Sequence, residues 1–293
     1  MMAAGLAAQL ACILEATARK AGNVHRFADF DDVTYLDFIL SAAAVAGPIG
    51  RARELGVGRA VLGAVEATRT LVGSNTNLGI ILLLAPLAAI EDIEAPRAGV
   101  ARVLRATTVG DARLVYAAIR RSGAGGLGEA AEQDVEGEPT VDLVAAMRLA
   151  ADRDLVARQY AENYADVFDL ALPVLRDQID AGRPVERAIV ATHLTILAER
   201  PDTLIARKRG VEVAAEASRR AASVRDAGPA EFNEFDAWLR ADGHARNPGT
   251  SADLATAALF LALREGTIDP GATLARLGWS STPSTNRQRE PVP

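Results

Sequence analysis

Apolar residues recur with the spacing of an α-helix along almost the whole chain, and this limits the fold more than any single motif. No segment shows several β-branched residues in strict alternation between turn signals, the pattern that predicts strands. No fixed-period repeat appears, which argues against a solenoid. The pattern predicts helices over residues 3–18, 32–47, 57–72, 76–90, 97–121, 140–160, 164–181, 184–199, 210–226, 229–241 and 251–264. Asp32 is expected to cap the second helix, which should end at Gly47 and Pro48.

The composition agrees with a helical interior. Hydrophobic residues, mainly Ala and Leu, make up 49% of the 293 residues, whereas aromatic residues make up only 4%. Ala and Leu are strong helix formers. We therefore expect an all-α fold, a single large multi-helix bundle domain over residues 1–279. Residues 280–293 are polar and rich in proline, and we expect them to form a flexible C-terminal tail.

Charge and hydropathy exclude several classes of function. The net charge is −6 and the pI is near 5.3, so we expect no nucleic-acid partner. The apolar N-terminus has no basic residues before it, unlike a signal peptide, and residues 79–90 are too few to span a bilayer. Cys12, the only cysteine, is expected to be a small buried hydrophobe. These features predict a soluble, cytoplasmic protein.

The segment KAGNVHRFADFDD, residues 20–32, gathers unlike charges at a helix end. Lys20, His25 and Arg26 precede the carboxylates of Asp29 and Asp32. Phosphate oxygens are bound by Lys and Arg donors, and a hard cation is bound by carboxylates. The segment therefore fits a polyphosphate with its metal ion. An ordinary charged loop between two helices explains it equally well.

Two further segments carry polar residues beside apolar helices. SNTNLG, residues 74–79, offers Asn75 and Asn77 to a base or ribose, although Ser74 or Asn75 can simply cap the next helix. PDTLIARKRG, residues 201–210, sets Asp202 before three consecutive cations, which suit a triphosphate or complement a helix dipole. His193, one helix earlier, is expected to be a core histidine.

The segment NPGTSADLATAALF, residues 247–260, is a turn followed by a helix. Ser251 is a plausible cap for this helix. Asp253, in its first turn, either stabilises the helix end or faces a metal ion or a substrate hydroxyl. The Gly-rich run within residues 122–139 is a weak phosphate signal, because it lacks the strand-turn-helix setting of a phosphate-binding loop.

These motifs, in this order, resemble those of triphosphoribosyl-dephospho-CoA synthases, from about residue 10 to residue 265. The resemblance rests on EATARKAGNVHRFADFDD, FILSAAA, SNTNLG, GGLG, PDTLIARKRG and NPGTSADLATAALF. It implies an all-helical transferase that joins ATP to dephospho-CoA and releases adenine, for prosthetic-group biosynthesis. Asn77 and Leu78 stand where other members more often have His and Lys. This departure is typical of a divergent branch, whose acceptor can differ from dephospho-CoA and can belong to one-carbon (pterin-linked) cofactor synthesis.

The chemistry that the resemblance implies needs cations for the triphosphate, Mg²⁺ as cofactor, and a base for the attacking hydroxyl. The sequence offers one candidate set for each role. For phosphate and nucleotide binding these are Lys20, His25, Arg26, Asn75, Asn77, Arg207 and Lys208. For metal binding they are Asp29, Asp32 and Asp202, and for the base they are Asp253 or Glu15.

Two other classes of function remain open on the sequence alone. Polar clusters at helix ends also occur in Mg-dependent helical hydrolases of nucleotide or ADP-ribosyl bonds. A non-catalytic helical partner in a biosynthetic complex is the other alternative, although carboxylates gathered at loop tips argue against it. The sequence is compatible with a homo-oligomer, and ATP with an alcohol acceptor are the expected small-molecule partners.

Overall fold

The structure, a computed structural model, describes residues 1–123, 135–225 and 228–271. Within these ranges the chain is helical and forms no strand, apart from an isolated bridge between His25 and Ala28, which confirms the all-α prediction. Most of the Gly-rich run of 122–139 and all of the tail 280–293 lie outside the described residues. The helices are α1 (Ala4–Thr17), α2 (Tyr35–Gly50), α3 (Ala52–Leu55), α4 (Val57–Leu71), α5 (Leu78–Ala88), α6 (Pro96–Arg105), α7 (Val109–Ser122), α8 (Leu143–Arg148), α9 (Leu155–Ala161), the π-helix η1 (Val167–Ala171), α10 (Leu172–Asp180), α11 (Val185–Glu199), α12 (Thr203–Arg209), α13 (Val211–Val224), α14 (Pro229–Arg240) and α15 (Gly249–Glu265).

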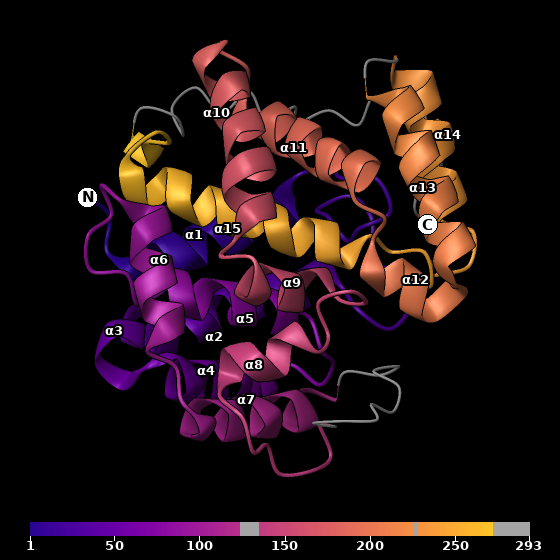
Figure 1. The fold of residues 1–293 in the computed structure, drawn as a ribbon. Coiled ribbons are helices and arrows are strands. Elements are labelled where there is room, and N and C mark those ends of the chain that lie inside the picture. The colour runs from indigo at the N-terminus through magenta and orange to yellow at the C-terminus, as the bar shows by residue number, and fades with distance from the viewer. Residues whose placement is uncertain (124–134, 226–227, 272–293) are drawn as a thin grey trace, which may run out of the picture.

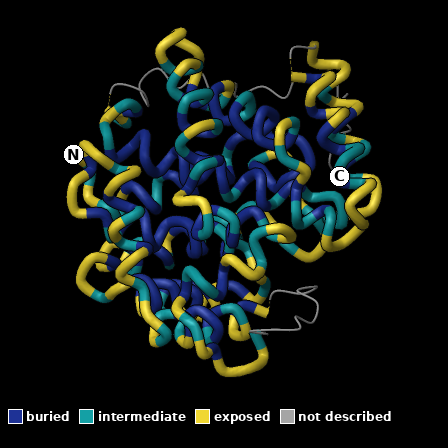
Figure 2. The backbone as a smooth tube through the Cα atoms, viewed as in Figure 1, coloured by how far each residue is buried: buried dark blue, intermediate teal, exposed yellow. Residues whose placement is uncertain are grey.

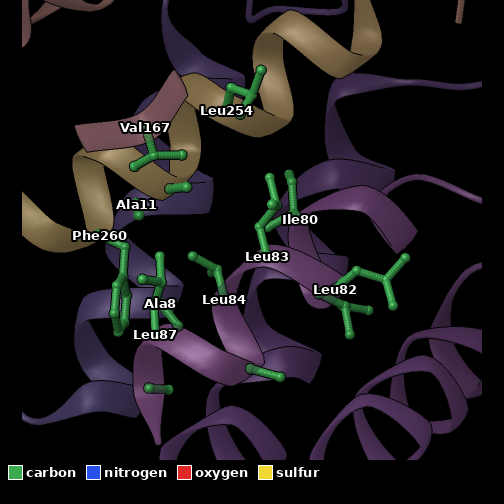
Figure 3. Packing of buried hydrophobic residues seen from close by; sticks show 14 of the residues in the cluster. Ala8, Ala11, Ile80, Leu82, Leu83, Leu84, Leu87, Val167, Leu254 and Phe260 are labelled. Carbon is green, nitrogen blue, oxygen red and sulfur yellow. The ribbon is translucent and has the colours of Figure 1, made fainter. Parts of the chain in front are cut away.

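Helices α5 and α15 form the centre of the main core. In α5 every residue except Gly79 is buried, and in α15 the buried residues run almost unbroken from Thr250 to Arg264. Figure 1 shows α15 crossing the middle of the molecule, with α10 and α11 on one side and α1 and α5 on the other. The backbone in this middle layer is mostly buried (Figure 2). Figure 3 shows Leu254 and Phe260 of α15 beside the leucines of α5.

A proline inside α5 is accommodated by two tyrosines from the region of α9. Pro86 has no N–H, so it cannot donate to the carbonyl of Leu82 four residues earlier. The buried Tyr160 hydroxyl donates to that carbonyl (2.6 Å), and the Tyr164 hydroxyl donates to the carbonyl of Leu83 (2.9 Å). These bonds satisfy backbone acceptors in an apolar interior and fix α9 against α5.

A second, smaller core joins α12, α13 and α14 to one face of α11. It includes Leu197 from α11, Ile205 from α12 and Leu239 from α14. Ala21, from the loop after α1, packs into the same cluster. The polar loop of residues 20–32 is therefore held against this part of the molecule, which lies on the right in Figure 1.

Three predicted boundaries are wrong, each because a local cap or core contact outweighs the apolar period. The predicted helix 97–121 divides into α6 and α7, since Thr108 forms a capping box with Asp111. The predicted helix 140–160 divides into α8 and α9, because Asp154 caps the second part. The helix at 32–47 is capped by Thr34 rather than Asp32, and it continues to Gly50. Its last turn carries Ile49, which is fully buried.

Other expectations are confirmed. Cys12 and His193 are both buried, as predicted. No helix within the described ranges combines the length and the apolar character that a membrane crossing requires.

Candidate active site

The motifs singled out in the sequence meet around the first turns of α15. Asp202, at the start of α12, is fully buried and joins two helices. One of its carboxylate oxygens accepts the N–H groups of Leu204 (2.9 Å) and Ile205 (3.2 Å), which caps α12. The other accepts both the N–H (2.7 Å) and the hydroxyl (2.8 Å) of Ser251 in α15. Ser251 therefore does not cap α15, which begins at Gly249; it binds the cap of α12.

A threonine beside Asp202 brings α9 to the same place. The Thr203 hydroxyl accepts the N–H of Leu155 and donates to the hydroxyl of Thr250, both at 3.2 Å. Asp154, the cap of α9, forms an ion pair with Arg207 (3.5 Å) from the end of α12. The starts of α9, α12 and α15 are thus linked by hydrogen bonds that involve side chains.

The Asp253 carboxyl group lies directly over Gly79, in the first turn of α5. A Cβ atom at position 79 would come within 2.0 Å of Oδ2 of Asp253, so only glycine permits this approach. The segment SNTNLG thereby meets NPGTSADLATAALF in space. Within the described part of the chain, no hydrogen bond or ion pair occupies the Asp253 carboxyl group, in contrast to the four donors on Asp202.

The surroundings of Asp253 disfavour its ionised form. Burial raises the pKa of this carboxyl group well above its ordinary value, and the negative charges of Glu15, Asp202 and Asp154 raise it further. The positive charge of Arg207 acts in the opposite direction. The charges that act on Asp253 come from α1, from α12 and from the start of α9, which shows that these segments share one site.

Glu15 lies in the last turn of α1 and is almost completely buried. Its carboxylate forms an ion pair of 2.9 Å with Lys20, which is fully buried. The Lys20 ammonium also donates to the backbone carbonyl groups of Glu15 (2.5 Å) and Ala18 (3.3 Å). All three N–H bonds of Lys20 therefore have acceptors within the protein, and none faces an exposed surface.

The remaining positive groups of the 20–32 segment are also held by the protein. The His25 ring is buried, its Nδ1 accepts the N–H of Phe27 (3.2 Å), and burial next to four cations lowers its pKa to about 3. Arg26 donates to the carbonyl of Thr17 (3.1 Å), pairs with Glu186 (3.0 Å) and stacks on the Phe27 ring. His25 is consequently neutral at physiological pH, and Arg26 anchors the loop to the start of α11.

Glycine is required where this loop turns. Gly22 has a φ of +75°, and a Cβ atom there would come within 2.7 Å of the Leu239 side chain in α14. Its N–H donates to Asp236 (2.7 Å), also in α14. The Gly-Asn pair that interrupts the first helical pattern is therefore the point where the loop docks on α14.

The two predicted nucleoside-binding amides occupy different environments. Asn77 is buried and donates to the hydroxyl of Thr68 (3.3 Å) in α4. Asn75 is exposed, and its side chain accepts the N–H of Leu78 at the start of α5 (3.2 Å). Thr76 shares a hydrogen bond of 2.6 Å with Ser41, from the FILSAAA segment in α2. This contact joins the two motifs in space.

The outer edge of the site carries exposed charges from two predicted segments. Lys208 donates to the carbonyl of His244 (3.3 Å), and the Asp32 carboxylate pairs with the His244 ring (3.2 Å). Burial and the neighbouring Arg207 lower the pKa of Lys208, whereas Asp32 and Asp202 raise it. The 20–32 and 201–210 segments therefore meet at His244. Asp29 lies on the exposed side of the loop and accepts the N–H of Tyr35 (2.6 Å).

A comparison with protein families matches residues 1–269 to the family described as ATP:dephospho-CoA triphosphoribosyl transferase. The chain belongs to this family. Among solved structures, the chain is similar to a candidate triphosphoribosyl-dephospho-CoA synthase from Archaeoglobus fulgidus, with 27% sequence identity and a TM-score of 0.64. That similarity covers 78% of this chain and 99% of the other. No curated protein matches the chain significantly.

In this member of the triphosphoribosyl transferase family, the three predicted metal ligands do not form one cluster. Within the described ranges, no group of three or more His, Cys, Asp or Glu side chains is arranged to hold a metal ion. Asp202 is fully engaged by protein donors, and Asp29 has one oxygen occupied. Asp32 is 62% exposed, and its one partner among the described residues is His244. Of the three, the exposed Asp32 alone is compatible with Mg²⁺ that arrives with a triphosphate, because Mg²⁺ needs few protein carboxylates when phosphates ligate it.

Several residues of the candidate site are not indicated by the sequence. Asp154 stands before an apolar run, as a helix cap does, but the apolar period predicts a longer helix through this position. Gly79 belongs to the SNTNLG motif, and the sequence alone does not indicate that its missing side chain makes room for Asp253. No sequence pattern indicates a role for Thr203 or Thr250, because their hydrogen bond depends on how α12 packs against α15.

A cavity of about 1000 Å³ lies elsewhere, around the C-terminal end of α15. Met1, Phe168 and Arg264 are among the residues that line it. Arg264 is separated from Asp253 by 11 residues of α15, which corresponds to about 16 Å along the helix axis. None of the residues singled out in the sequence lines this cavity, and we do not assign the transferase chemistry to it.

Proposed function

We propose that the protein transfers the triphosphoribosyl group of ATP to a hydroxyl group of dephospho-CoA and releases adenine. The observation that carries this proposal is the Asp253 carboxyl group. It lies over Gly79, has no partner among the described residues, and is surrounded by charges from α1, α9 and α12. A carboxyl group that is unpaired and whose pKa is raised is suited to accept a proton in a reaction near neutral pH.

Asp253 acts as the general base in this proposal. Its ionised carboxylate takes the proton of the acceptor hydroxyl as that oxygen attacks C1′ of the ATP ribose. The bond between C1′ and the adenine ring breaks, and its electron pair leaves with adenine, which then gains one proton. Positive charge develops on the ribose during this step, and nearby carboxylates stabilise such a centre, as they do in glycosidases. Glu15 is buried and paired with Lys20, and its negative charge acts on Asp253.

The triphosphate is assigned to the end of α12. Among the described residues, Arg207 is held only by a long ion pair with Asp154 (3.5 Å), and Lys208 by one hydrogen bond to a backbone carbonyl. Both cations can therefore turn to phosphate oxygens at small cost. Asp32, next to Lys208, is our candidate ligand for Mg²⁺ that arrives with ATP. The ion would neutralise part of the charge on the phosphates.

Other predicted site residues are reassigned to structural or positioning roles in this proposal. Lys20 and Arg26 have their polar groups bound to the protein, and Asp202 joins α12 to α15. His25 is bound through Nδ1, and its buried Nε2 has no partner among the described residues. Asn77 is buried against α4, whereas the exposed Asn75 remains our candidate for contact with the nucleoside.

The acceptor is dephospho-CoA or an alcohol of related size. The family description names dephospho-CoA as the acceptor of the family. Asn77 and Leu78 mark the departure of SNTNLG from the family pattern, and a pterin-related alcohol is the alternative acceptor for such a divergent member.

The test is the release of adenine from Mg-ATP by purified protein, with and without dephospho-CoA. Adenine that appears only with the acceptor supports transfer, whereas adenine that appears equally without it supports a hydrolase. The Asp253→Asn variant should lose at least a hundredfold in turnover, since general-base catalysis contributes about 10²–10⁴-fold. Asp177→Asn, at an exposed carboxylate of α10, is the matched control and should keep full activity. Protein that binds no Mg-ATP at millimolar concentration contradicts the proposal and favours a non-catalytic partner.

A further inference from the structure

An arginine without an anionic partner is buried at the C-terminal end of α15, which lies beside the N-terminus in Figure 1. Arg264 is only 7% exposed and lines the cavity of about 1000 Å³ there. Within the described ranges no carboxylate pairs with it, and its Nε and Nη1 have no hydrogen-bond partner. Its Nη2 lies 3.7 Å from the sulfur of Met1, which is a weak acceptor. A guanidinium has five N–H bonds, so the three on Nε and Nη1 lack an acceptor in this part of the chain.

Burial of such a group without a partner is unfavourable for the fold. Buried charges in proteins are normally paired, and the other arginine of this cavity follows the rule, because Arg176 pairs with Glu265. Burial lowers the pKa of the Arg264 guanidinium, although an arginine keeps its charge in proteins. The nearest ring, that of Phe260, lies 5.8 Å from the guanidinium carbon and replaces no hydrogen bond. An unsatisfied buried cation in the wall of a cavity indicates a site for an anion.

The carboxylates around the cavity restrict the charge of that anion. Glu94 and Asp269 line the cavity from exposed positions, whereas Glu265 is held by Arg176. Because these groups are negative, they repel a doubly charged phosphate more than a singly charged carboxylate. A carboxylate also matches the planar guanidinium, with which it forms two parallel hydrogen bonds. The charges therefore favour a ligand with a single carboxylate.

Much of the remaining wall is apolar. It includes the buried side chains of Leu172, Leu263 and Ile268 and the half-buried ring of Phe168. The volume is at the upper end of the range for small-molecule sites, which is about 300–1000 Å³. Such a wall binds the apolar body of a ligand whose head group reaches the guanidinium. The Met1 residue is 84% exposed, so its side chain can give up the weak contact with Nη2 when an anion replaces it.

We propose that this cavity is a second ligand site, separate from the transferase site, and that it binds a monocarboxylic acid with an apolar body through Arg264. A fatty acid of medium chain length has this chemistry, with one carboxylate for the guanidinium and an alkyl chain for the apolar wall. Arg264 is 11 residues of α15 away from Asp253, about 16 Å along the helix axis. The ligand therefore binds without occupying the place assigned to ATP.

The test is calorimetric titration of the full-length protein with decanoate, decanol and decyl phosphate. The three probes share one alkyl chain and differ in the charge of the head group. Decanoate should bind one site with a submillimolar Kd, and decanol should bind at least about tenfold more weakly, because hydrogen bonds to a charged group are lost. Decyl phosphate should also bind more weakly than decanoate, since Glu94 and Asp269 repel its second charge.

The variant Arg264→Met tests the residue itself. It should weaken decanoate binding at least about tenfold and leave the weak binding of decanol unchanged. Its Tm without ligand should not fall, because the substitution removes a buried charge that has no partner. Adenine release should stay within twofold of the wild type. Arg59→Met, at an exposed arginine of α4 that does not line the cavity, is the matched control and should keep full affinity for decanoate.

Four results would overturn the inference. Decanoate that shows no saturable binding at millimolar concentration removes the site, and equal affinity for decanol and decanoate reduces it to an apolar groove. Tighter binding of decyl phosphate replaces the carboxylate with a phosphate as the ligand. A fall of about 5 °C or more in the Tm of Arg264→Met shows that the protein itself supplies the missing anion. Loss of adenine release in the wild type would refute the proposed function and leave these binding results unaffected.

Discussion

Removal of the Asp202 side chain should destabilise the fold far more than removal of a similar cap nearby. In Asp202→Ala, the N–H groups at the start of α12 lose their acceptor, which costs about 0.5–2 kcal/mol for a helix cap. The buried N–H of Ser251 also loses its acceptor, at about 1–3 kcal/mol. The sum is a loss of about 2–5 kcal/mol in the free energy of unfolding.

Asp154→Ala is the matched control. Asp154 also accepts two N–H groups at the start of a helix, at 2.8 and 3.0 Å, but its side chain is 29% exposed. Water can replace these bonds, and the ion pair with Arg207 is long, so the expected cost is about 0.5–2 kcal/mol. The difference between the variants should be about 2 kcal/mol, or about 4–8 °C in Tm if the protein follows the trend of somewhat smaller domains.

The assay is urea unfolding followed by circular dichroism, together with calorimetric titration of Mg-ATP. Asp202→Ala should show a lower unfolding midpoint and, under conditions where it is folded, an affinity for Mg-ATP within threefold of the wild type. The reasoning is refuted if the two variants are equally stable. It is also refuted if Asp202→Ala keeps its stability and loses Mg-ATP affinity by tenfold or more, since Asp202 would then be a ligand.

Three further predictions follow from contacts in and near the site. Gly79→Ala should lower kcat at least tenfold and change Tm by only a few degrees, because the alanine Cβ would lie 2.0 Å from Oδ2 of Asp253 and displace that flexible carboxyl group. Steady-state kinetics and thermal unfolding of the variant test this prediction. Tyr160→Phe should destabilise the protein by about 1–3 kcal/mol in urea unfolding, since Pro86 provides no N–H for the Leu82 carbonyl; an effect below 0.5 kcal/mol contradicts this account. Lys208→Ala should raise KM for ATP about tenfold with little change in kcat, whereas unchanged kinetics remove this side chain from the site.

The residues that the sequence placed in the site fall into two groups once the structure is known. In the proposed function, Asp253, Arg207 and Lys208 are the residues that act on the substrate. Lys20 and Asp202 carry the same kinds of charge, yet both are fully buried and bonded to the protein. Residue type and motif position are alike in the two groups, so the sequence could not separate them.

The sequence by itself determined the helical class, the family and the set of polar segments that meet. Helical periodicity is a local property of the sequence. The capping residues Thr108 and Asp154 are also visible in the sequence, but the apolar period continues across both positions and predicts longer helices there. Only the tertiary structure decided which charges face solvent and which face one another. Burial and the pairing of Lys20 with Glu15, or of Asp202 with Ser251, depend on how helices distant in the sequence pack. The pKa of Asp253 depends on the same packing, because desolvation and neighbouring charges act through space.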